Sequence, residues 1–167
     1  LSENFFTRTM KDPRQKSRFA IFVLAVTLFS GYVNCHCASI VTDAPQRNCI
    51  EVLGVAQDGG RPHLGCEKSC CAELTENNLV AALAVHGQSE WLLIDATPDM
   101  PEQIRNAGSM PAAIILTHAH IGHYTGLTHL GREVMSSDRL PVWCSARMAD
   151  YLRSNGPWSQ LVALNNI

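Results

Sequence analysis

The chain has 167 residues, of which 46% are hydrophobic and 17% are charged, and its formal net charge is −2. This near-average composition predicts one globular domain and excludes disorder over most of the length. The small negative charge, without a basic stripe, argues against a nucleic-acid partner. Seven cysteines and seven histidines occur largely in clusters, which indicates metal binding before a disulfide scaffold.

Residues 1–39 are predicted to be an N-terminal extension outside the folded domain. A basic stretch at 11–18 precedes the apolar run 19–30 and small residues at 37–39. This order is typical of a secretory signal peptide, and the run is shorter than the roughly 20 apolar residues of a membrane span. We therefore expect an exported protein, periplasmic or extracellular, that contacts the membrane only through this segment. An uncleaved membrane anchor and a buried core helix are the alternatives.

Residues 40–167 are predicted to form a partial domain of the α/β class. The apolar segment 48–56 predicts a buried strand, which ends in a turn at Asp58, Gly59 and Gly60. Further strands are expected at 79–86, 91–94, 112–116 and 141–144, and helices at 98–107, 124–130 and 146–153. The four residues 87–90 have the length and the glycine of a hairpin turn. Apolar strands followed by helices predict an α/β layered fold.

Three histidines follow the expected strand 112–116, namely His118, His120 and His123. Residues two apart in an extended backbone face the same side, so the first two imidazoles should project together. Gly122 permits a sharp turn that can bring His123 back to the same point. Two or three neutral imidazoles on a rigid strand end are what zinc needs from one segment of a catalytic site. We therefore expect a metal here, with surface or core histidines that bind nothing as the alternative.

The histidine segment, residues 116–127, resembles the His-x-His-x-Asp-His signature of the metallo-β-lactamase superfamily. The resemblance implies an αββα sandwich, of which this chain would be a fragment holding the N-terminal half. It also implies that His118 and His120 bind a first metal and His123 a second. Asp95 matches an aspartate that lies beneath the metals and orients the histidine loop. A strand-terminal aspartate that only caps a turn is the alternative for Asp95.

One position departs from that signature. Gly122 stands where the superfamily places an aspartate that binds the second metal. Because glycine has no side-chain donor, the second site would be weakened or rebuilt from elsewhere, and a single metal held by His118, His120 and a later histidine is the simplest outcome. We expect one or two zinc ions at the active site, with iron or manganese as alternatives.

A cysteine cluster, defined as Cys66, Cys70 and Cys71, follows the first expected strand. Together with residues 54–65 it resembles the N-terminal region of coenzyme PQQ synthesis protein B and of the phosphodiesterase of phosphonate breakdown. Those relatives carry three cysteines near a structural zinc, in a tighter Cys-x-Cys-x-x-Cys spacing. Clustered thiolates suit such a site, and a disulfide or free thiols are the alternatives. The other cysteines of this domain are expected to be buried in strands: Cys49 and Cys144.

For the complete protein, the resemblance implies a metal-dependent hydrolase that cleaves a small-molecule ester, lactone or phosphodiester with metal-bound hydroxide. The chain has no histidine after His129, so we expect the later ligands of the superfamily to be missing and the fragment to be inactive. A protein of PQQ biosynthesis, acting as a carrier or metal-dependent oxygenase, is an alternative function. A non-catalytic metal-binding homologue is another. The sequence indicates no oligomeric state.

Overall fold

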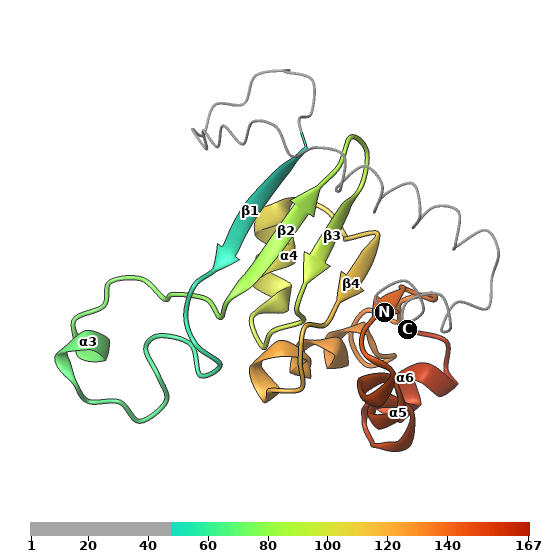
Figure 1. Cartoon of the computed structure of the whole chain (residues 1–167). Coiled ribbons are helices and arrows are strands. Elements are labelled where there is room, and N and C mark those ends of the chain that lie inside the picture. The colour runs from blue at the N-terminus through green and yellow to red at the C-terminus, as the bar shows by residue number, and fades with distance from the viewer. Residues whose placement is uncertain (1–47) are drawn as a thin grey trace, which may run out of the picture. The chain divides into compact units, whose positions relative to one another are not determined.

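The computed structural model of the chain describes residues 48–167 (Figure 1). The signal peptide or membrane anchor predicted within residues 1–39 lies outside this range. No helix of residues 48–167 combines the length and apolar character needed to cross a membrane.

Within the described residues, five strands form one mixed sheet in the order β1-β2-β3-β4-β5. The strands are β1 Cys49–Gly54, β2 Ala82–His86, β3 Trp91–Ile94, β4 Ala113–Ile115 and β5 Val142–Trp143. The first three pair antiparallel, whereas β3, β4 and β5 pair parallel. The Gly87 N–H donates to the Glu90 carbonyl at 2.8 Å, which closes the predicted hairpin turn. Every strand lies inside a range predicted from the sequence.

The helices agree less closely with the sequence-based expectation. They are α3 Ser69–Ala72, α4 Met100–Ala107, α5 Ala146–Ser154, α6 Trp158–Ala163 and two 3₁₀ helices, η1 Ile121–His123 and η2 Thr125–Leu130. α4 and α5 were predicted, and the helix expected at 124–130 is the 3₁₀ helix η2. α3 and α6 were not predicted. Helices of four and six residues are too short to form by propensity alone. α6 is stabilised by the packing of Leu161 and Trp158 against the core.

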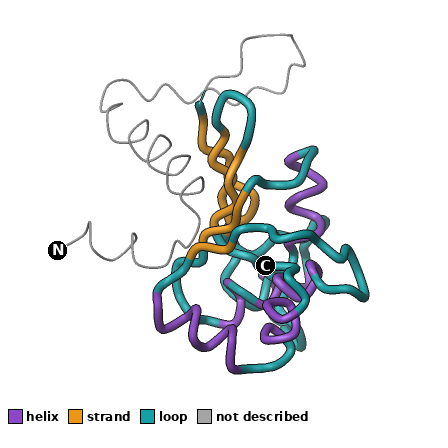
Figure 2. Tube along the Cα trace, turned by 90° about the vertical axis from the view of Figure 1, so that its right-hand side faces the viewer, coloured by secondary structure: helices purple, strands orange, loops and turns teal. Residues whose placement is uncertain are grey.

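One face of the sheet packs against α4, as Figures 1 and 2 show from two directions. The buried side chains of this layer belong to a single hydrophobic cluster: Leu53, Ala84, Leu93, Ile114 and Met100. The opposite face is also apolar but is half-buried or exposed: Ile50, Val52, Leu83, Val85, Leu92 and Ile94. A sheet covered on one face, with an apolar second face, is the arrangement expected of one half of an αββα sandwich.

Segment 48–56 contains the predicted strand, but the prediction that this strand is buried is wrong, as is the prediction that Cys49 is buried. β1 lies at the edge of the sheet, and Ile50 and Val52 are 57% and 61% exposed. These side chains lie on the face of the sheet that no layer of residues 48–167 covers. Cys49 is exposed and Cys144 is half-buried.

A buried polar network fixes the start of α4 against the segment that precedes β2, next to the point where β3 ends. The Thr97 hydroxyl donates to Gln103 Oε1 at 2.7 Å, and Gln103 Nε2 donates to the Val80 carbonyl at 2.7 Å. The Val80 N–H donates in turn to Asp99 Oδ2 at 2.8 Å. Because these buried polar groups find partners, the network makes the segment after β3 rigid.

Candidate metal centre

The parallel pairing of β3 and β4 brings Asp95 next to the histidine segment. Both strands end at the same edge of the sheet, and Ile94 pairs with Ile115 (Figure 1). The buried Asp95 carboxylate accepts hydrogen bonds from the Thr117 N–H at 2.8 Å and from the Thr117 hydroxyl at 2.8 and 3.0 Å. Asp95 has φ 68°, a left-handed conformation that is uncommon outside glycine. The surrounding contacts therefore hold this carboxylate in a defined place.

Asp95 also sets the orientation of His123. His123 Nδ1 lies 2.8 Å from Asp95 Oδ2. Because a carboxylate only accepts hydrogen bonds, Nδ1 carries the proton, and in the neutral ring Nε2 has a free lone pair. Asp95 thus contacts a predicted metal ligand, and its role in orienting that ligand stays a prediction.

The backbone holds the histidine segment close to the end of β3. The Ala96 N–H donates to the His123 carbonyl at 2.9 Å, and the Gly126 N–H donates to the Ala96 carbonyl at 2.9 Å. A Cβ at Gly126 would lie 2.1 Å from the Thr97 carbonyl oxygen, so this approach requires glycine.

The Thr117 hydroxyl also contacts His118 and helps to orient its ring. His118 Nδ1 lies 2.8 Å from the Thr117 hydroxyl oxygen. The hydroxyl has one proton, which it donates to Asp95, so the His118 ring donates Nδ1–H to the hydroxyl oxygen. The Nε2 atom of His118 is then unprotonated in the neutral ring. Thr117 is a positioning residue that the sequence reading did not single out.

The predicted residues come together in space. One donor atom from each of Asp95, His118 and His123 lies within 4.8 Å of the others. His120 Nδ1 lies 3.0 Å from His118 Nε2, and the His118 and His123 ring centroids are 4.1 Å apart. Imidazole and carboxylate donors at these separations fit a zinc ion, and the rings of His118 and His120 are open to solvent. Metal binding by these residues stays a prediction.

Asp58, which the sequence indicated only as a turn residue, also lies at this centre. Its Oδ2 accepts the Gly122 N–H at 3.2 Å, and its Oδ1 lies 3.5 Å from His123 Nε2. The hydrogen bond from Gly122 is the largest effect and holds the pKa of Asp58 below its usual value. Desolvation opposes this lowering of the pKa, and His123 and His120 add smaller contributions that lower it further. Sequence reasoning could not place Asp58 here because 64 residues separate it from Gly122.

The cysteine cluster is also assembled. The three sulfur atoms lie within 4.8 Å of one another, and no disulfide links them. A hydrogen bond from the Cys66 thiol lowers the pKa of Cys71 and raises the pKa of Cys66. Three thiols at this separation have the donor chemistry of a structural zinc site.

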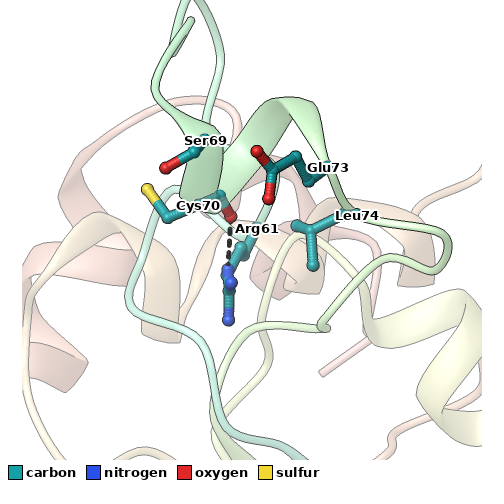
Figure 3. A pocket seen from close by; sticks show the side chains of 5 residues that line it. All are labelled: Arg61, Ser69, Cys70, Glu73 and Leu74. Carbon is teal, nitrogen blue, oxygen red and sulfur yellow. Dashed lines mark hydrogen bonds between the residues drawn. The ribbon is translucent and has the colours of Figure 1, made fainter.

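A shallow pocket of about 290 Å³ lies beside the cysteine cluster (Figure 3). Its lining consists of Arg61, Ser69, Cys70, Glu73 and Leu74. Arg61 directly follows the turn at Asp58, Gly59 and Gly60, called here the glycine-rich turn. Its Nε donates to the Cys70 carbonyl at 2.8 Å, which links this turn to α3. No residue of the histidine segment lines this pocket, so it is separate from the candidate metal centre.

Comparison with known proteins agrees with the observed fold. Residues 90–164 match the β-lactamase superfamily domain, and the matched solved structures have the metallo-β-lactamase fold. The resemblance to the metallo-β-lactamase superfamily is confirmed. The chain therefore has an α/β fold of the metallo-β-lactamase type, and it resembles the branch that the cysteine loop indicated.

Curated relatives carry the name coenzyme PQQ synthesis protein B. The protein from Azoarcus sp. (strain BH72) is 34% identical over 125 residues, which cover 65% of this chain and 40% of the relative. The protein from Klebsiella pneumoniae subsp. pneumoniae is 31% identical over 125 residues, covering 65% of this chain and 39% of the relative. The chain thus spans about 40% of the length of these curated relatives.

Two solved structures resemble the chain over most of its described length. A diphosphatase from the PhnP family has a TM-score of 0.53 at 27% identity, covering 62% of this chain and 44% of that protein. Zn²⁺-bound PqqB from Methylobacterium extorquens has a TM-score of 0.59 at 23% identity, covering 68% of this chain and 46% of that protein. The second likeness establishes the fold alone.

Proposed function

We propose that the complete protein is a metal-dependent hydrolase that cleaves a small-molecule ester, lactone or phosphodiester, with zinc at the centre formed by His118, His120 and His123. The observation that carries this proposal is the convergence of two imidazoles whose Nδ1 atoms are held by neighbours. One donor atom from each of His118 and His123 lies within 4.8 Å of the other and of Asp95, and Thr117 and Asp95 contact their Nδ1 atoms.

The proposed role of each residue follows from its contacts. The histidines act as metal ligands and not as acids or bases, and neighbours engage the Nδ1 atoms of His118 and His123. Asp95 and Thr117 keep the rings oriented and their ligating nitrogens basic. When bound, zinc lowers the pKa of a water molecule to about 7, which supplies hydroxide at neutral pH, and polarises the scissile carbonyl or phosphoryl group. The solvent-exposed His118 and His120 leave the site open to substrate.

The similar proteins support this reading in two respects. The structural neighbour described as a diphosphatase favours a phosphoester among the three substrate classes. The neighbour described as Zn²⁺-bound supports zinc as the metal. We further propose a structural zinc at the cysteine cluster and export of the protein through its N-terminal segment.

The test uses the full-length protein. Elemental analysis should find zinc, and a panel of phosphodiesters, lactones and esters should reveal turnover that His118→Ala abolishes. Glu51→Gln is the matched control, because it breaks another histidine–carboxylate contact, 2.8 Å to His86, away from the metal centre. His118→Ala protein that kept both its active-site metal and its turnover would contradict the proposal.

A second candidate function is a step in PQQ biosynthesis, as a carrier or a metal-dependent oxygenase. It is favoured by the curated relatives named coenzyme PQQ synthesis protein B. Bound iron without hydrolysis of the panel would support this alternative. Bound metal with neither activity would indicate a non-catalytic metal-binding homologue.

A further inference from the structure

At the metal centre, Asp58 fills the space that a side chain at Gly122 would need. A Cβ built on Gly122 would lie 2.6 Å from Asp58 Cα and 2.7 Å from both Asp58 Cβ and Cγ. The absence of a side chain at Gly122 is therefore what allows the glycine-rich turn to approach. The buried Gly122 N–H completes the contact by donating to Asp58 Oδ2 at 3.2 Å.

The other oxygen of Asp58 faces the second ring nitrogen of His123. His123 Nδ1 contacts Asp95 Oδ2 at 2.8 Å. Its Nε2 lies 3.5 Å from Asp58 Oδ1. The distance exceeds the usual N–H···O range of about 2.7–3.2 Å. It is close to the about 3.4 Å that separates two ligand atoms bound at about 2.1 Å in a tetrahedral zinc site.

We propose that Asp58 is a metal ligand, and that the glycine-rich turn supplies from another segment the carboxylate that Gly122 cannot provide. The inference rests on the proposed metal centre and adds a ligand to it. Asp58 Oδ1 and His123 Nε2 bind the same cation, while Gly122 holds Oδ2 in place through its N–H.

In this arrangement, the position of Asp58 depends on glycine at position 122. Any side chain at Gly122 displaces Asp58, because the clash includes the Asp58 Cα and not only the end of a flexible side chain. Substitution at either position therefore removes the same ligand. Glu51 again offers a control, because its carboxylate also contacts a histidine, His86 at 2.8 Å, but toward the opposite end of β3.

The experiment measures Zn²⁺ affinity by calorimetry and follows Co²⁺ binding by its visible absorption, in the full-length protein. We expect Asp58→Asn and Gly122→Ala each to weaken binding at the histidine site at least about 10-fold and to change the Co²⁺ spectrum. The double variant should bind no more weakly than either single variant, because one ligand is lost in all three. Circular dichroism and thermal unfolding of the metal-free proteins should confirm that each variant is folded.

The outcomes separate this inference from the proposed function. If Asp58→Asn binds Zn²⁺ and Co²⁺ as tightly as Glu51→Gln does, while His118→Ala does not bind, Asp58 is not a ligand and the metal centre stands. Additive losses in the double variant would also overturn the inference, since they would mean that Gly122 acts separately from Asp58. If the unmodified protein binds neither ion at the histidine site, the metal centre and the inference both fail.

Discussion

Asp95→Asn tests how the carboxylate controls the metal centre. Asparagine tolerates the left-handed backbone at this position, so the substitution removes charge without adding backbone strain. The amide oxygen can still accept from Thr117, but the amide nitrogen then faces His123 Nδ1, where the ring now donates at 2.8 Å. Two donors cannot pair, so the His123 ring must move or shift its proton to Nε2, the atom expected to bind metal.

The structure sets the size of the effect. One charge-assisted hydrogen bond is lost at side chains that are only 8% and 14% exposed, which should cost about 1.5–3 kcal/mol of folding stability. Zn²⁺ affinity should fall about 10- to 100-fold, as for other partners that orient a ligating histidine. Calorimetry measures the affinity, and nitrogen-15 NMR of the imidazoles identifies the tautomer. Zn²⁺ affinity equal to that of Glu51→Gln, with the His123 tautomer unchanged, would refute the reasoning.

Three further predictions concern the scaffold and the cysteine cluster. Gly126→Ala should lower the free energy of unfolding by about 2–5 kcal/mol, because the added methyl collides with the Thr97 carbonyl and breaks backbone hydrogen bonds. Chemical denaturation measures this loss, and Gly156→Ala, at a position with open space around it, is the control. Leu93→Ala should cost about 2–5 kcal/mol in the same assay, whereas Leu64→Ala at a 94% exposed position should not. Zn²⁺ should slow alkylation of all three thiols of the cysteine cluster, as mass spectrometry would show, and equal rates with Zn²⁺ and with a chelator would argue against a structural zinc there.

The dependence of Gly122 on Asp58 gives a physical reason for the departure from the superfamily signature. In this chain, the space that a side chain at Gly122 would fill belongs to the Asp58 turn. A carboxylate can therefore reach His123 from position 58, at the cost of requiring glycine at 122. In the proposed centre, the carboxylate is therefore supplied by the segment around Asp58 and not by position 122.

Local patterns were enough to locate the strands and the histidine segment. Apolar runs bounded by glycine and polar residues marked β3 and β4, because strand formation here depends on short-range hydrophobic pattern. The two-residue spacing of His118 and His120, directly after a buried strand, likewise placed both rings at one edge of the sheet. Asp95 was recognisable for the same reason, since it directly follows a strand.

Burial and long-range contacts required the tertiary structure. The apolar content of β1 suggested a buried strand, but whether Ile50 and Val52 are covered depends on which layer packs over their face. The sequence predicted Asp58 only as a turn residue. Its contact with Gly122, 64 residues away, forms only when the glycine-rich turn folds back onto the histidine segment. The sequence by itself thus determined which elements form and which segment carries the histidines, because those properties depend on neighbouring residues. The tertiary structure decided which side chains meet, because such contacts depend on the path of the whole chain.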